Sequence, residues 1–110
     1  MADKATSIKE VFDEIPERFN PDAAAGVDAV FQFDLSGDNG GKYWVKVADQ
    51  QVDVNEGEHE DPTLTVLASA DDYLAMVNGE IAPMSAFMQG KVKVKGNMGL
   101  AMKLQGIFGL

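Results

Sequence analysis

Residues 27–55 read VDAVFQFDLSGDNGGKYWVKVADQQVDVN, and this stretch has the pattern of three consecutive strands. In residues 27–35, apolar side chains occupy every second position, which is the period of a strand with one buried face. The glycine-rich segment 36–41 predicts a hairpin connection to a return strand at residues 43–48. A third strand is expected at residues 51–55, so the stretch predicts an antiparallel meander.

The segment before this meander predicts an amphipathic helix. Ser7 and Glu10 form a capping-box pattern, and apolar residues recur at helical spacing in residues 8–15. Pro16 is expected to kink this helix or to open a new turn that runs to Phe19.

The segment after the meander predicts a mixture of strands and helices. An acidic loop at residues 56–62 precedes a fourth strand at residues 63–68, and Ser69 then caps a helix that ends at Gly79. The remaining expected elements are a short helix at residues 83–89, a strand at residues 91–95 and a last helix at residues 97–108. This order predicts an α+β domain with a five-stranded, mostly antiparallel sheet covered on one face by helices.

The composition limits the class of protein. A chain of 110 residues normally forms one domain, so we expect a single domain over residues 1–110, with residues 1–6 as a flexible tail. The sequence has no cysteine, which excludes disulfides, thiolate metal sites and cysteine nucleophiles. Because neither a signal-peptide pattern nor an apolar run of membrane-spanning length is found, cytoplasmic localisation is expected.

Charge is distributed unevenly along the chain. The net charge is −9, but residues 1–80 hold all 18 acidic residues and five of the nine basic ones, whereas residues 81–110 hold four lysines and no acid. An acidic protein is repelled by phosphate backbones, and four lysines without arginine are a weak basis for a nucleic-acid interface. We therefore expect no nucleic-acid partner.

Residues suited to catalysis are nearly absent. The only histidine, His59, lies in the acidic loop, and no serine is expected close to it, so no pair of base and nucleophile is predicted. The carboxylates of this loop lack the spacing of an EF-hand, and we expect no metal site there. Asp71 and Asp72 lie in the first turn of a helix, where they favour the helix dipole and point in different directions. The sequence therefore predicts no catalytic residue and no cofactor.

Methionines gather in one part of the chain. Every methionine except Met1 lies between Met76 and Met102. Methionine has three rotatable bonds and a polarisable sulfur, which lets one surface fit several apolar shapes. Two interpretations stay open at this point: these side chains fill gaps in the core, or they form a deformable wall for an apolar ligand.

Three motifs follow one another in a specific order. They are VFQFD at residues 30–34 with the glycine pair at 40–41, the helix start SADDY at residues 69–73, and PMSAFMQGKVKVKG at residues 83–96. Together they resemble the sterol carrier protein type 2 lipid-transfer domain, over nearly the whole chain. The resemblance implies an internal hydrophobic tunnel for fatty acids, acyl-CoA esters, phospholipids or sterols, and no catalytic group. Because no peroxisomal address ends the chain and no enzyme is fused to it, we expect a single-domain member outside the peroxisome.

This resemblance places an acyl chain between the sheet and the later helices. The side chains expected to line the tunnel or its entrance are Phe33, Met76, Phe87, Met88, Met102, Leu104, Ile107 and Phe108. Each methylene removed from water contributes about 0.8 kcal/mol, so ten methylenes supply roughly 8 kcal/mol before ordering costs. Micromolar binding of a lipid or acyl-CoA ligand is therefore expected without a specific polar contact.

Lysines alternate with valines in the fifth expected strand. Lys91, Lys93 and Lys95 are expected on one side, with Val92 and Val94 facing the core. The lysines either protect an exposed strand from aggregation or contact lipid head groups at an anionic membrane surface, transiently.

A different class of function also stays open. The chain would then be an accessory module that scaffolds a lipid-metabolism enzyme and binds little ligand of its own. In either case we expect a monomer or a weak homodimer.

Overall fold

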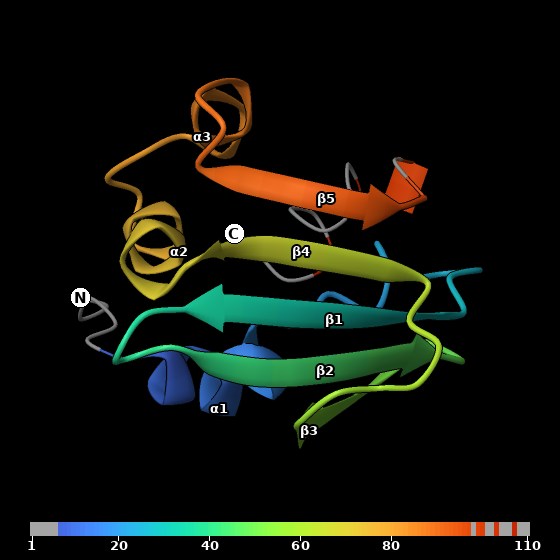
Figure 1. Cartoon of the computed structure of the whole chain (residues 1–110). Helices are drawn as coiled ribbons and strands as arrows, with labels where there is room; N and C mark the ends of the chain where they lie inside the picture. Colours follow the sequence, from blue (N-terminus) through green and yellow to red (C-terminus); the bar gives the residue numbers. More distant parts are fainter. Residues whose placement is uncertain (1–6, 98, 101–102, 104–106, 108–110) are drawn as a thin grey trace.

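The computed structural model describes residues 7–97, 99–100, 103 and 107, and this part of the chain contains five strands and three helices (Figure 1). The elements are α1 (Ile8–Arg18), β1 (Ala29–Ser36), β2 (Gly41–Ala48), β3 (Gln51–Glu56), β4 (Leu64–Ser69), α2 (Ala70–Val77), α3 (Pro83–Met88) and β5 (Val92–Gly96). Residues 1–6 and most of the last expected helix lie outside the described residues, although residues 99, 100, 103 and 107 have helical backbone.

The five strands form one sheet in the order β3-β2-β1-β4-β5. The β1–β2, β2–β3 and β4–β5 pairs are antiparallel, which confirms the predicted meander and the mostly antiparallel sheet. β4 pairs with β1 in parallel, with Phe31 opposite Leu64. This parallel pair arises because the connection after β3 returns the chain past β2 and β1 before β4 begins, as Figure 1 shows at the right of the sheet.

The two faces of the sheet have different surroundings. In β1, Ala29, Phe31, Phe33 and Leu35 are buried on one face, and the register aligns them with the apolar residues of β2 and β4. Figure 1 shows α1 behind the sheet, with α2 at one end of β4 and α3 beyond the edge formed by β5. The hydrophobic core therefore lies between one sheet face and the helices, while the opposite face, called the outer face below, carries the charged side chains.

Local sequence signals at the helix starts are confirmed. The hydroxyl oxygens of Ser7 and Ser69 accept backbone N–H hydrogen bonds from Glu10 and Asp72, at 3.2 and 3.1 Å. Each bond satisfies one of the amide donors that a helix start leaves without an intrahelical partner. The two serines therefore fix where α1 and α2 begin.

Two further sequence signals concern proline and glycine. Pro16 lies inside α1, which continues to Arg18. Because Pro16 is close to the end of the helix, its missing N–H removes one intrahelical hydrogen bond without ending the helix. In the β1–β2 hairpin, a Cβ at Gly40 would lie 2.1 Å from the carbonyl oxygen of Leu35. Gly40 therefore allows the chain to pass close to the end of β1, as the glycine-rich connection predicts.

Candidate functional site

Aromatic rings fill the space between α1 and the centre of the sheet. Phe12 stacks on Tyr43 with ring centroids 4.3 Å apart and meets Phe33 edge-on at 5.1 Å. Tyr73 completes the cluster, 6.2 Å from Phe12 and 5.8 Å from Phe33. Burial raises the pKa of the Tyr73 phenol, which keeps it neutral. This half of the core is therefore packed by its own rings.

The other half of the core is lined by smaller and more flexible groups. Apart from Tyr73, the buried hydrophobic side chains from β4, α2, α3, β5 and the C-terminal segment are Leu64, Val66, Ala68, Ala70, Met76, Ala86, Val92 and Ile107. The Ile107 carbonyl accepts a 2.8 Å hydrogen bond from the Asn20 N–H, which attaches the C-terminal segment to the turn after α1. None of these described side chains is charged, so this half of the core offers only aliphatic and thioether groups.

The predicted ligand-binding residues fall into three groups. Phe33, Met76 and Ile107 are buried in one core cluster, Phe87 and Met88 are 43% and 79% exposed, and Met102, Leu104 and Phe108 lie outside the described residues. The structure therefore brings three of the predicted residues together and places two others on the surface.

α3 turns its smallest side chain toward the core. Ala86 is fully buried, whereas Met84, Phe87 and Met88 are exposed. The three large side chains follow the spacing i, i+3, i+4 and so share one helix face. Their spacing alone would favour the opposite orientation, with the large face inward. Ala86 is absent from the predicted site because no signal in the sequence marks this alanine as the buried position.

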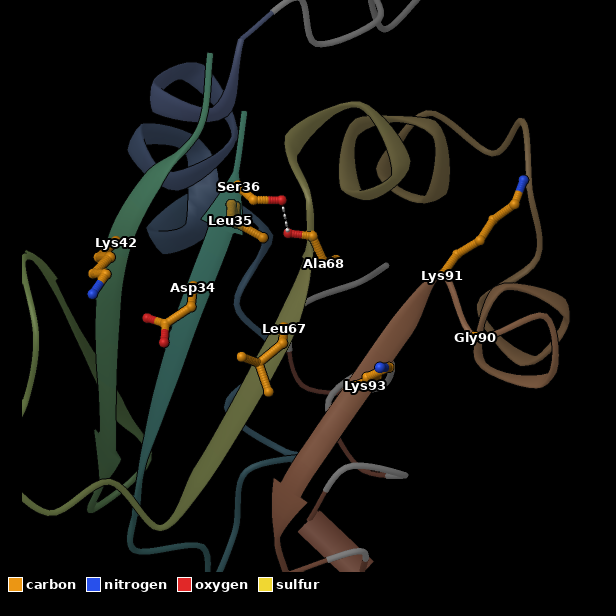
Figure 2. Close-up of a pocket in the computed structure, with 9 residues that line it drawn as sticks. All are labelled: Asp34, Leu35, Ser36, Lys42, Leu67, Ala68, Gly90, Lys91 and Lys93. Atoms are coloured by element: carbon orange, nitrogen blue, oxygen red, sulfur yellow. Dashed lines mark hydrogen bonds between the residues drawn. The ribbon is translucent and has the colours of Figure 1, made fainter. Parts of the chain in front are cut away.

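β5 places its lysines on the outer face. Val92 and Val94 pair with Ala68 and Val66 on the core face, so Lys93 and Lys95 point to the opposite side, as the alternation predicts. Lys91, which is expected on the same side, precedes β5 and is not part of this register. Figure 2 shows Lys93 beside an open hollow of about 390 Å³, with Asp34 and Leu67 across it. Leu35 and Ala68, whose side chains lie on the core face, also line this hollow, so it reaches from the outer face to the ends of β1 and β4.

A buried glutamine holds the acidic loop against the outer face. The Nε2 group of Gln32 donates to the carbonyl oxygens of Gly57 and Tyr43 at 3.0 and 3.2 Å, and its Oε1 accepts from the His59 N–H at 2.8 Å. His59 lies edge-on to Trp44, with ring centroids 4.8 Å apart. Gln32 is thus a structural residue that fixes the position of the only histidine.

The outer face offers no group of metal ligands within the described ranges. No cluster of three or more histidine, cysteine, aspartate or glutamate side chains is found in that part of the chain. Among the same residues, no helix combines the length and the apolar character needed to cross a membrane.

Comparison with known proteins assigns the fold to a family. The model of the SCP-2 sterol transfer family matches residues 8–109. The chain belongs to this family. Hydroxysteroid dehydrogenase-like protein 2 from Bos taurus is 35% identical over 103 residues, which are 93% of this chain and 25% of the bovine protein. The chain thus spans about a quarter of the length of this curated relative.

Two solved structures of SCP2 domains have the same architecture. Apo sterol carrier protein 2 from Yarrowia lipolytica superposes with a TM-score of 0.77 at 25% identity, covering 98% of this chain and 93% of that one. Palmitated SCP2L2 from Aedes aegypti superposes with a TM-score of 0.76 at 25% identity, covering 94% and 95%. The resemblance predicted from the three motifs is confirmed, and so is the five-stranded α+β fold.

Proposed function

We propose that this SCP2 domain binds the apolar chain of a lipid between β4, β5 and the covering α2, α3 and C-terminal segments, and carries it without chemical change. The observation that supports this proposal most directly is the division of the core. Aromatic rings fill the half under α1, whereas the other half is lined by alanine, valine, isoleucine and Met76. Small and flexible side chains yield to a ligand more easily than interlocked rings do.

The ligand class follows from the chemistry of this lining. The buried side chains of this half carry no charge among the described residues, so affinity would come from transfer of methylenes out of water. The Aedes aegypti relative is described as palmitated, which supports a fatty acyl chain as the ligand of this domain also. Fatty acids, acyl-CoA esters, phospholipids and sterol-like molecules share the required apolar body.

The structure refines the list of proposed contacts. Met76 and Ile107 would touch the acyl chain, with Ala86 opposite β5 as an additional wall residue, and Phe33 would border the site from the aromatic half. Met102, Leu104 and Phe108 stay in the proposal as residues of the C-terminal segment. Phe87 and Met88 are exposed in the structure, so they are not among the proposed contacts.

Uptake of a fluorescent fatty acid tests the proposal. Purified protein should bind the probe with micromolar affinity, and native mass spectrometry should detect copurified fatty acid or phospholipid. An Ala86→Leu variant adds three carbons to the proposed ligand space and should weaken uptake by about tenfold, since it replaces part of the ligand volume. Ala29→Leu is the matched control, because Ala29 is also buried but lies at the start of β1, away from α3. Equal uptake by both variants would count against the site.

One observation favours a second candidate function. The bovine relative carries a matching segment as a quarter of a longer protein whose name refers to a hydroxysteroid dehydrogenase. The chain would then be an accessory module that docks on a lipid-metabolism enzyme. Protein that copurifies without lipid and takes up no fatty acid would favour this alternative over the carrier.

A further inference from the structure

Three large apolar side chains of α3 are exposed side by side. Met84, Phe87 and Met88 are 64%, 43% and 79% exposed, and they are named the α3 patch below. Single exposed apolar residues are common on protein surfaces, but neighbours on one helix face form a continuous patch that usually marks an interaction site. α3, which carries the patch, stands beyond the β5 edge of the sheet (Figure 1).

A lysine is fixed at the end of this patch by the way α3 stops. The Gly90 N–H donates to the Phe87 carbonyl at 3.1 Å, and the Lys91 N–H donates to the Ala86 carbonyl at 2.9 Å. With Gly90 at φ +76°, these bonds form a Schellman motif, which locks the residue after the glycine against the last helical turn. Lys91 also lines the outer-face hollow, and Figure 2 shows its side chain extending away from Asp34.

The charge around the patch differs in sign from the rest of the protein. Residues 81–110 contain four lysines and no acid, whereas residues 1–80 contain 18 acids and five bases. Lys91 and Lys93 are exposed; the nearest acid in the sequence is Glu80, and Asp34 lies across the outer-face hollow from Lys93. An anionic surface would therefore repel most of the molecule and attract the edge formed by α3 and β5. This asymmetry orients the patch toward such a surface.

We propose that the α3 patch and Lys91 form a docking surface for an anionic lipid bilayer. The apolar side chains would enter the boundary between head groups and acyl chains, while Lys91 and Lys93 would contact lipid phosphates or carboxylates. A bilayer fits better than a folded protein, because a six-residue helix offers far less than the roughly 800 Å² per partner of a stable protein interface. Methionine side chains, moreover, adapt to a fluid surface without a matching shape. The inference deepens the proposed carrier function, since a carrier must reach membranes to load and unload.

Sedimentation of the full chain with vesicles tests this surface. The probe is a vesicle of equal parts phosphatidylcholine and phosphatidylglycerol, with pure phosphatidylcholine as the neutral reference. Replacing the patch by glutamines (M84Q, F87Q and M88Q together) should weaken binding by roughly hundredfold. Lys91→Glu should weaken it by about thirtyfold, and Glu80→Lys should strengthen it. Lys46→Glu is the control, because Lys46 is an exposed lysine of β2 on the outer face, far from α3 in the strand order.

Fatty acid uptake is measured on the same variants without vesicles. The docking surface is supported if the patch variant loses vesicle binding and keeps uptake. It is overturned if the variant loses uptake and keeps vesicle binding, since the side chains would then belong to the ligand site. It is also overturned if Lys46→Glu weakens vesicle binding as much as Lys91→Glu does. A third contrary result would be a homodimer, seen by sedimentation of the protein without vesicles, that the patch substitutions dissociate. Vesicle binding by a protein that takes up no fatty acid would leave this inference intact and remove the proposed carrier function.

Discussion

Three phenylalanine-to-alanine substitutions test whether the structure assigns the apolar side chains correctly. Phe33 is fully buried, and its ring meets Phe12 at 5.1 Å and Tyr73 at 5.8 Å, whereas Phe87 is 43% exposed. Truncating a buried phenylalanine costs about 3–5 kcal/mol, including the cavity that it leaves. We expect Phe33→Ala to cost about 4 kcal/mol. Phe12→Ala should cost about 5 kcal/mol, because among the described residues Phe12 contacts three rings and Phe33 two.

Phe87→Ala is the matched control with the same chemical change. About half of its ring already contacts water, so the expected cost is below about 1 kcal/mol. Urea unfolding followed by circular dichroism measures all three. With a slope of about 2 kcal/mol per molar urea, the Phe33 variant should unfold at a midpoint about 2 M lower, while the Phe87 variant should stay close to the parent. If Phe87→Ala destabilises as much as Phe33→Ala, α3 packs its large face inward and the α3 patch does not exist.

Three other substitutions address the outer face, a glycine and a buried phenol. Gln32→Leu should cost about 2–3 kcal/mol and shift the emission of Trp44, because the acidic loop loses its anchor and a backbone N–H loses its acceptor. Gly96→Ala should destabilise by about 2 kcal/mol more than Gly57→Ala in thermal unfolding: both glycines have positive φ, but only at Gly96 would a Cβ lie 2.5 Å from a backbone oxygen. Burial raises the pKa of Tyr73 above its ordinary value of 10.0, so the unfolded chain loses this proton first and stability falls as the pH rises above 10. Tyr73→Phe should flatten this fall by up to about 1.4 kcal/mol per pH unit, and an unchanged slope in urea titrations at alkaline pH would show that the phenol is accessible.

Most of the fold is predictable from local pattern, because each strand alternates strictly between its two faces. The valines and lysines of residues 91–95 predict both the existence of β5 and the side on which its lysines lie. The parallel pairing of β4 with β1 is not contained in any local pattern. It depends on which strand the chain lies beside after β3. The residues of the connection predict a turn, but they do not predict which strand β4 pairs with.

The candidate site is harder to predict, because both faces of α3 are apolar or nearly so. Large side chains at i, i+3 and i+4 ordinarily predict the buried face of a helix, and Ser85 and Gln89 would then face solvent. In the structure Ala86 is buried and the large residues are exposed. A helix of six residues is too short to be held by its own hydrogen bonds, so its orientation is set by the neighbouring β5 and α2.

The two proposals assign different tasks to the two apolar sides of α3. Its inner side presents only the methyl group of Ala86 to the proposed lipid site. Its outer side presents three large side chains at the edge where the charge of the protein becomes positive. If α3 instead turned its large face inward, Phe87 and the two methionines would fill the proposed ligand space. No large apolar side chain of α3 would then remain to insert into a bilayer. The reversed orientation thus serves both proposals at once, and a lipid leaving the site between α3 and β5 would already be next to the membrane surface that receives it.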